Sequence, residues 1–394
     1  MKGIHSIHLV LLDRVLEDAW ITFEDGVIVA FGERERPAAV EWLDGERLYV
    51  APGLIDLHVH GGNGADALDG TPEALRTIAD YHLAHGTTSL CPTLITTTYD
   101  RIANALDAWE SARTGLKARL LPLHLEGPHF ARTKAGAHDP ALLHAATDEE
   151  IGWLVERAAG ISQMTVAPEM PNALELIEHG SKAGIVMSAG HTEAREEHMR
   201  PALEAGLRKV THLYNAMTFA EKRGLFRIAG LAEYALTEDR LSCEIIADGV
   251  HVEPVLLKLA YQSKGAGRLA LISDALAGTG LPVGSEFALG TLRAKVGERY
   301  CLLANGSALA GSATRMMDQV RIMTKSVGVP LHEAIRMATH TPARLIGRDG
   351  HLGAIVCGHA ADLVRFDANF RVHDVWVGGA EAPKRQTAKT VRPI

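Results

Sequence analysis

The 394-residue sequence has only four cysteines, and they are scattered without the Cys-x-x-Cys spacing of zinc ribbons or redox motifs. A disulfide scaffold and a cysteine-based zinc finger are therefore excluded, and a reducing cytoplasm is the expected location. Aromatic residues make up just 5% of the chain, whereas hydrophobic residues make up 47% and charged residues 22%. This composition excludes disordered and collagen-like chains and indicates a globular protein.

Long apolar segments and an excess of basic charge are also missing. No apolar run approaches the roughly 20 residues that cross a bilayer. No small-residue cleavage site follows the apolar stretch near the N-terminus, so a secretory signal is not expected either. The formal net charge of −8 argues against a nucleic-acid or membrane-surface partner. Only the segment from Ala382 to Ile394 is polar and basic, and we expect it to fray in solvent.

Histidine is the residue that the sequence has in excess, with 20 against twelve lysines. Imidazole binds metals and carries protons near neutral pH, so the positions of the histidines direct the search for a site.

The two ends of the chain are similar in pattern. Short strand-like runs with turns fill residues 1–50, where Asp25-Gly26 marks a hairpin, and similar runs bounded by glycines follow from residue 353. We therefore expect a small β-sandwich domain built from residues 1–50 and 353–394, the latter including the basic tail.

Residues 51–352 alternate apolar, β-branched runs with helical periodicity, as in the helices expected at residues 72–84 and 100–112. This pattern predicts an α/β fold, a closed (β/α)₈ TIM-type barrel, in which reactive residues lie at the C-terminal ends of the strands. No Gly-x-Gly-x-x-Gly opens a helix, which disfavours a doubly wound sheet. The predicted strands are Leu54–His58, Thr88–Leu90, Leu120–Leu125, Gln163–Ala167, Ile185–Ala189, Lys209–Leu213, Cys243–Ala247 and Leu269–Ser273.

Candidate metal ligands lie at the ends of these strands. His58 and His60 alternate with one residue between them, so both side chains point to the same face of the first strand. Such a pair forms half of a metal site, although it can also be two polar residues leaving a strand. Glu126 ends an apolar strand, where a carboxylate is paired, solvated or on a metal. His191 and His212 lie at the ends of two further strands. Taken alone, each is more often a hydrogen-bonded core histidine than a metal ligand.

Three further groups fall on the same rim. Asp274 ends the eighth strand, where a carboxylate can accept a proton from a metal-bound water and pass it to a leaving group. Its alternative role is that of a helix N-cap. His138 follows the third strand and His251 follows the seventh, and each by itself reads more readily as a solvated loop histidine.

Six strings in this order resemble the amidohydrolase superfamily and, within it, the family of N-acetylglucosamine-6-phosphate deacetylases. Each string alone is a weak signal, whereas the ordered set along nearly the whole chain is a strong one. The strings are Pro52–His60, His124–Pro128, Gly190–Thr192, Thr211–Met217, Ile246–His251 and Leu309–Ser312.

The resemblance implies that Glu126, His191 and His212 hold the main divalent metal. His58 and His60 would contribute to a second metal, with Glu126 between the two. The fourth strand lacks the lysine that many amidohydrolases carbamylate to bridge two metals, so dihydroorotase-like and hydantoinase-like activities are disfavoured. Nitrogen and oxygen ligands without thiolate suit one or two ions of zinc, the expected metal, or of iron, cobalt or manganese.

The implied reaction is metal-assisted hydrolysis of the acetyl group of N-acetylglucosamine-6-phosphate, giving glucosamine-6-phosphate and acetate. Asp274 would carry the proton and His138 would polarise the acetyl carbonyl. An arginine from the neighbouring subunit of a homodimer would complete the phosphate site, with Arg223 favoured over Lys222 and Arg227. The implied substrate-binding residues are Ala137, His138, Asn215, Ala216, Arg223, His251, Leu309, Ala310 and Gly311.

Several alternatives stay open. The galactosamine counterpart differs in the stereochemistry of one hydroxyl, and another N-acyl substrate, such as an N-acylated amino acid, is a further possibility. A catalytically inactive scaffold is disfavoured because the whole ligand set is present. The family pattern has an aromatic residue where this chain has His129. We expect His129 to be a surface histidine rather than one that approaches the metal rim.

Overall fold

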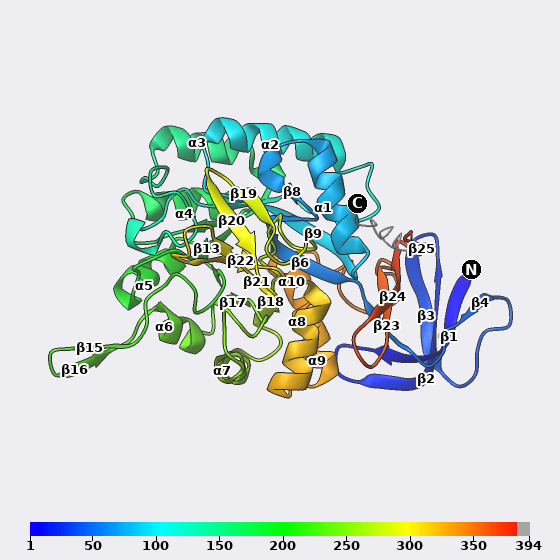
Figure 1. Ribbon diagram of the computed structural model, residues 1–394. Helices are drawn as coiled ribbons and strands as arrows, with labels where there is room; N and C mark the ends of the chain where they lie inside the picture. Colours follow the sequence, from blue (N-terminus) through cyan, green and yellow to red (C-terminus); the bar gives the residue numbers. More distant parts are fainter. Residues whose placement is uncertain (384–394) are drawn as a thin grey trace.

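The computed structural model describes residues 1–383, and the basic tail from residue 384 lies outside the described residues. A parallel barrel fills the middle of the chain, and a sheet made from both ends packs beside it (Figure 1). Among the described residues, no helix combines the length and apolarity that crossing a membrane requires.

All eight predicted barrel strands are present, and their order in the sheet follows their order in the sequence. The barrel is closed where β18 meets β6: the Asp274 amide donates to the His58 carbonyl at 2.9 Å, and Val59 pairs with Ala275. The (β/α)₈ prediction is thus confirmed. The strands are β6 (Leu54–Val59), β9 (Thr87–Ile95), β11 (Leu123–Glu126), β12 (Ile161–Val166), β13 (Val186–Ala189), β14 (Lys209–Val210), β17 (Ser242–Ile245) and β18 (Leu269–Leu271), and the short β10 (Arg119–Leu120) pairs with β9.

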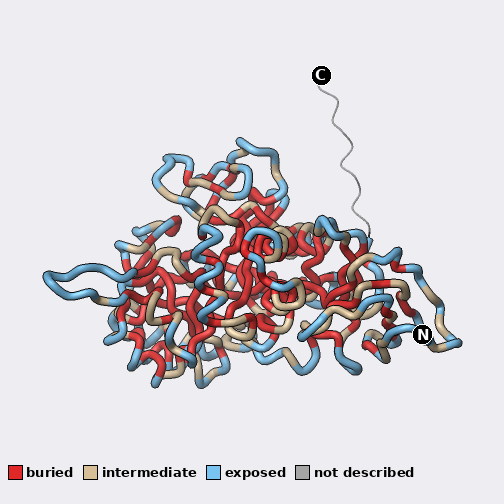
Figure 2. Tube along the Cα trace, turned by 90° about the horizontal axis from the view of Figure 1, so that it is seen from below, coloured by how far each residue is buried: buried red, intermediate tan, exposed pale blue. Residues whose placement is uncertain are grey.

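The helices surround the barrel and bury one apolar face each. The two expected at residues 72–84 and 100–112 form at Pro72–Leu83 and Tyr99–Ala112, and the first has Thr71 as its N-cap and Pro72 in its first turn. Figure 2 shows how the buried trace gathers inside this shell. The helices are α1 (Pro72–Leu83), α2 (Tyr99–Ala112), α3 (Asp148–Glu156), α4 (Ala173–Lys182), α5 (Glu196–Glu204), α6 (Leu231–Thr237), α7 (Pro254–Lys264), α8 (Met316–Ile322), α9 (Leu331–Met337) and α10 (His340–Leu345).

The two chain ends form one mixed sheet of eight strands. The segment after the barrel joins it through β23, which pairs antiparallel with β5. Side chains from strands as far apart as β3 and β24 share one apolar core, so the sheet curls on itself. The strands are β1 (Lys2–Val10), β2 (Val15–Glu24), β3 (Val27–Glu33), β4 (Glu41–Asp44), β5 (Tyr49–Pro52), β23 (Leu363–Phe366), β24 (Val372–Val377) and β25 (Ala380–Glu381).

The hairpin predicted at Asp25-Gly26 joins β2 to β3. Both turn residues have positive φ angles, 49° and 85°, which is the backbone that a two-residue hairpin turn requires and that Asp-Gly tolerates.

Two β-hairpin insertions were not predicted from the sequence. A four-stranded antiparallel sheet stands between β18 and α8, and an isolated hairpin projects from the barrel at the left of Figure 1. The strands of both insertions are exposed or only half buried, so no continuous apolar run marks them in the sequence as it marks the barrel strands. The four-stranded sheet contains β19 (Glu286–Leu289), β20 (Leu292–Val296), β21 (Tyr300–Leu303) and β22 (Leu309–Ser312); the projecting hairpin contains β15 (Glu221–Arg223) and β16 (Phe226–Ile228).

Candidate metal centre and active site

The residues predicted as metal ligands converge at the C-terminal ends of four barrel strands. Glu126 lies at their centre. Its Oε1 atom is 3.0 Å from the Nε2 atom of His212 and 3.3 Å from that of His191. The same carboxylate reaches the other pair, with His58 Nε2 at 3.4 Å from Oε1 and His60 Nε2 at 3.2 Å from Oε2. One buried carboxylate therefore contacts four histidines from three other strands.

These side chains form two adjoining sets of possible ligands, and each set offers one atom per residue within 4.8 Å of the others. The first set contains His58, His60 and Asp274, and the second contains Glu126, His191 and His212. Asp274 Oδ1 lies 3.3 Å from His60 Nε2. The structure thus brings Asp274 into contact with the predicted ligands.

The donor chemistry of the cluster fits divalent cations. The Nε2 atoms of His58 and His60 lie 3.1 Å apart, and those of His191 and His212 lie 3.0 Å apart. Nitrogens that converge so closely on one carboxylate direct several lone pairs into the same space. A divalent ion held at these Nε2 atoms and the carboxylate would satisfy the converging lone pairs.

The electrostatics of the cluster keep its carboxylates ionised at neutral pH. Burial opposes the charged form of Glu126, yet the neighbouring imidazoles, led by His58, hold its pKa well below the usual range. Burial likewise opposes ionisation of Asp274, and His58 and His60 lower its pKa. Burial lowers the pKa of His138 to about 4, and His191 adds to this effect. The cluster therefore presents two carboxylates and a neutral His138.

The backbone at the strand ends is strained where the ligands are presented. His191, His212 and Asp274 have φ angles of 49°, 31° and 49°, in the left-handed region that residues other than glycine seldom occupy. Such strain costs about 1–3 kcal/mol per residue and persists where the surrounding structure enforces it. Here the enforcement is visible for Asp274, whose amide donates to the His58 carbonyl and whose carbonyl accepts from the Ser312 amide at 2.8 Å.

Buried polar residues beneath the rim hold the strands in register. Asp56 accepts hydrogen bonds from the amides of His58, at 3.2 Å, and Ser273, at 3.1 Å, as well as from the Ser273 hydroxyl. It therefore links the first and last barrel strands directly below His58 and Asp274. Burial raises the pKa of Asp56 to about 6.

A second buried support was missed by the sequence analysis. Lys209 Nζ donates to Glu244 Oε1 at 2.5 Å and also to Gln163, so three strands are joined inside the barrel. Glu244 Oε2 lies 3.7 Å from His58 Nδ1, on the side of the ring that faces away from the ligand cluster. The available signal was a charged residue within each of two apolar strands, Lys209 and Glu244, since a buried charge needs a partner.

A cavity of about 140 Å³ opens above the ligand cluster. Every predicted site residue lines it except His58, which is fully buried beneath, and Arg223. Part of the four-stranded insertion covers the cavity, because β22 carries Leu309, Ala310 and Gly311 to its wall. The lining residues are His60, Ile95, Glu126, Gly136, Ala137, His138, His191, His212, Asn215, Ala216, Ile246, His251, Asp274, Leu309, Ala310 and Gly311.

Arg223 lies away from this cavity, on the projecting hairpin. Its side chain is exposed, and its Nε donates to Glu221 Oε1 at 2.8 Å. Lys222 and Arg227 are cross-strand partners in the same hairpin. None of the three candidate phosphate cations therefore lines the cavity of its own chain.

The expectation for His129 was wrong. Its side chain is fully buried, not on the surface, and it does not line the metal cavity. Its ring bonds instead to Tyr99 and to the carbonyl of His144. A single residue following Gly-Pro gave no indication of these partners, which come from other segments of the chain.

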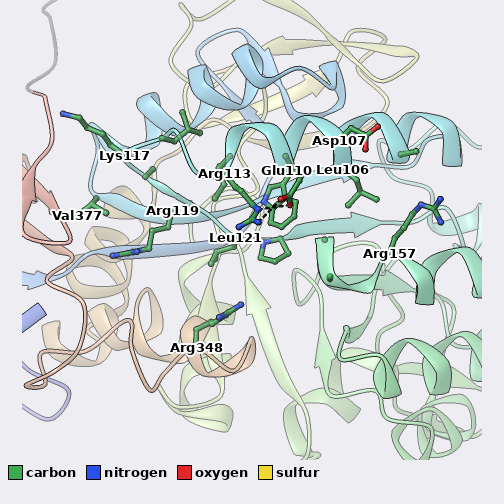
Figure 3. Close-up of a pocket in the computed structure, with 18 residues that line it drawn as sticks. Leu106, Asp107, Glu110, Arg113, Lys117, Arg119, Leu121, Arg157, Arg348 and Val377 are labelled. Atoms are coloured by element: carbon green, nitrogen blue, oxygen red, sulfur yellow. Dashed lines mark hydrogen bonds and ion pairs between the residues drawn. The ribbon is translucent and has the colours of Figure 1, made fainter. Parts of the chain in front are cut away.

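A larger cavity, of about 1090 Å³, lies at the opposite end of the barrel, where β10 and β12 begin (Figure 3). Its charged side chains are largely paired: Arg113 with Glu110 at 2.8 Å, and Arg119 with Asp362 at 2.7 Å. It contains none of the candidate ligands. Because barrel enzymes react at the C-terminal strand ends, the smaller cavity is the candidate active site.

A closed (β/α)₈ barrel with a rim of histidines and carboxylates defines a class, the metal-dependent hydrolases. Residues 49–382 match the model of the amidohydrolase family, and the chain belongs to that family. It is accordingly a hydrolase, and the metal dependence of the family agrees with the two ligand sets.

The chain is similar over nearly its full length to deacetylases. It is 31% identical to the N-acetylglucosamine-6-phosphate deacetylase of Vibrio furnissii, covering 96% of each chain. It is 34% identical to the N-acetylgalactosamine-6-phosphate deacetylase of Escherichia coli O157:H7, covering 92% of this chain and 94% of the relative. Its fold matches the crystal structure of N-acetylglucosamine-6-phosphate deacetylase from Pasteurella multocida with a TM-score of 0.91 at 29% identity, covering 97% and 99% of the chains.

Proposed function

We propose that this hydrolase removes the acetyl group of N-acetylglucosamine-6-phosphate, giving glucosamine-6-phosphate and acetate. The observation that carries the proposal is the position of Asp274, an ionised carboxylate 3.3 Å from a candidate metal ligand and open to the cavity. The names of the full-length relatives support the substrate class.

Hydrolysis breaks the bond between the acetyl carbon and the sugar nitrogen, and a water supplies the new oxygen and two protons. A metal held by Glu126, His191 and His212 supplies Lewis-acid activation of the water and of the acetyl carbonyl when bound. Asp274 accepts a proton from the attacking water and then donates it to the departing amine. Because its pKa is lowered, Asp274 is ready to act as the base at neutral pH.

His138 is suited to bind the acetyl oxygen as its negative charge grows. The Thr96 amide donates to His138 Nδ1 at 3.2 Å, which makes this nitrogen the acceptor. The neutral ring therefore carries its proton on Nε2, the nitrogen that faces Glu126 at 3.4 Å. A preset donor on the cavity wall stabilises the charge that grows on the acetyl oxygen more in the transition state than in the substrate.

His251 and Asn215 are proposed to hold the phosphate end, with the backbone near Ala216. The His251 Nδ1 atom lies 2.6 Å from Asp248 Oδ2. Burial opposes the charged ring, but Asp248 outweighs it and raises the pKa of His251. A positively charged imidazole on the cavity wall suits an anionic substituent. Ala137 and the Leu309–Gly311 segment would enclose the sugar between the two ends.

The ligand set supports zinc as the metal, in one or two ions per chain, with iron, cobalt and manganese as the other candidates. We also propose a cytoplasmic location, which the four free cysteines support.

We further propose that the chain works as a homodimer in which Arg223 reaches the phosphate in the partner's site. The projecting hairpin supports this, because its tip exposes two large apolar residues, Leu225 at 90% and Phe226 at 74%. Exposed apolar residues at the tip of an extension are typical of contact surfaces. Figure 2 shows the same hairpin as an exposed projection.

Arg223→Ala should raise KM for the phosphorylated sugar by about 10-fold or more, because a charged contact to phosphate contributes about 1.5–3 kcal/mol. The KM for the unphosphorylated sugar should not change. Steady-state kinetics with both sugars check this, with Lys222→Ala and Arg227→Ala as matched variants of the same hairpin. An equal effect on both sugars would place the phosphate elsewhere.

The substrate is tested by acetate release from a panel of compounds. The 6-phosphates of N-acetylglucosamine and N-acetylgalactosamine are compared with the unphosphorylated sugars and with N-acetyl amino acids. We expect the highest kcat/KM for N-acetylglucosamine-6-phosphate. The galactosamine epimer is the second candidate. It is favoured by the relative named N-acetylgalactosamine-6-phosphate deacetylase, to which the chain is 34% identical. Preference for an N-acetyl amino acid would overturn the proposed function.

A further inference from the structure

His129 belongs to a second cluster of possible metal ligands, separate from the rim. The chain turns after Glu126. The His129 ring then contacts Tyr99 of α2 and the carbonyl of His144, in the loop that precedes α3. His129, His144 and Glu150 each offer one ligand atom, and these atoms lie within 4.8 Å of one another. The two imidazole rings meet edge to face, with centroids 5.1 Å apart.

Both rings are oriented through their Nδ1 atoms. His129 Nδ1 lies 3.1 Å from the His144 carbonyl, and His144 Nδ1 lies 2.9 Å from the Leu142 carbonyl. A carbonyl oxygen can only accept, so each Nδ1 carries a proton and donates. Metal-binding histidines are held in this way, with one nitrogen donating to the protein and the other left for the ion.

Each Nε2 atom has a polar side-chain partner. His144 Nε2 lies 2.7 Å from Glu150 Oε1. His129 Nε2 accepts from the Tyr99 hydroxyl at 3.1 Å, and burial lowers the pKa of His129 to about 4, so its ring is neutral. Glu150 uses its other oxygen, Oε2, to cap α3 through the Thr147 amide at 2.9 Å, which holds the carboxylate in place.

We propose that His129, His144 and Glu150 bind a divalent transition metal of the zinc type, independently of the proposed deacetylase activity. Two nitrogens and one carboxylate oxygen make three of the four ligands of tetrahedral zinc. His144 is 44% exposed, so the fourth position is open to a water molecule. Binding replaces the proton on His144 Nε2, which is released, and breaks the Tyr99 hydrogen bond to His129.

The position of this site gives the ion a structural effect on the active site. His129 and His144 bracket the loop that carries Ala137 and His138 to the cavity, and Glu150 anchors the ion to α3. An ion that binds only the folded loop stabilises it in proportion to its occupancy. Zinc should therefore hold the loop that bears the proposed carbonyl-binding histidine.

The test counts zinc by mass spectrometry after equilibrium dialysis of the holoenzyme. The wild-type chain should bind one more zinc than His144→Ala and than Glu150→Gln, which keeps the size of the side chain. His179→Ala, which removes an exposed histidine of α4, is the matched control and should bind as many as the wild type. Cobalt absorption should show the same loss of one site. Equal zinc in all four proteins would overturn the proposal and leave a hydrogen-bonded cluster.

A second measurement, of thermal stability, distinguishes zinc bound at this cluster from zinc bound at the rim. Added zinc should raise the thermal midpoint of the wild type and of His179→Ala more than that of His144→Ala. An identical rise in all three would assign the effect to the rim and contradict the proposal. Because His144 is exposed, its loss should not prevent folding.

Discussion

Replacing Asp274 by Asn should lower kcat by about 10²–10⁴-fold while the protein keeps its metal, because general acid–base catalysis contributes that much. Asparagine has nearly the same shape and can still accept a hydrogen bond, but it cannot take up a proton. Glu126, His191 and His212 are unchanged, so the main ligand set remains intact. Steady-state acetate release and metal analysis of the same preparation measure the two quantities.

Two outcomes would contradict this role. An unchanged kcat would remove Asp274 from the mechanism. Loss of one metal together with the activity would make it a ligand, since it also lies 3.5 Å from His58 Nε2. Asp13→Asn, on the exposed surface of the small sheet, is the matched control and should behave as the wild type.

Removing the metal should abolish activity, and Glu126→Ala should do the same without a chelator. A bound metal lowers the pKa of water from 15.7 to about 7, and no side chain of the cavity supplies an equivalent effect. Glu126 is the carboxylate that contacts both histidine pairs, so its loss should weaken metal binding by both ligand sets. We expect no measurable acetate release, and a metal content lower than that of the wild type by the ions of the rim.

Adding zinc back should restore activity to chelated wild type but not to Glu126→Ala. The control is Glu73→Ala, an exposed carboxylate in the first turn of α1, which should retain metal and activity. A chelated enzyme that contains no metal and still releases acetate at the original rate would contradict the metal hypothesis. Circular dichroism checks that Glu126→Ala keeps its secondary structure.

The fold was largely predictable because its signals are local. Short apolar strands that alternate with helices indicate a parallel sheet with both faces covered, and eight such units indicate a barrel. The runs predicted at Leu54–His58 and Ile185–Ala189 correspond closely to β6 and β13. The insertions β15–β16 and β19–β22 were not predicted, because their strands are exposed or only half buried and form no continuous apolar run like those of the barrel.

The candidate site divides in the same way. The alternation of side chains along a strand places His58 and His60 on one face, whatever the rest of the chain does. The buried support of Lys209 with Glu244 was missed, as was the partner set of His129. Each of these two contacts joins residues from separate strands or loops. A single sequence does not show which residues that are distant along the chain come into contact in the fold.

The sequence by itself determined the class of fold, the strand ends and the residue types available for metal and proton chemistry, because these follow from periods of two and 3.6 residues. Only the tertiary structure decided which of these residues meet. Closure of β18 against β6 brings Asp274 to within 3.3 Å of His60, although 214 positions separate them in the chain. The packing of α2 and of the loop after β11 likewise turned His129 inward, to Tyr99 and His144, because contacts between distant segments depend on packing and not on local pattern.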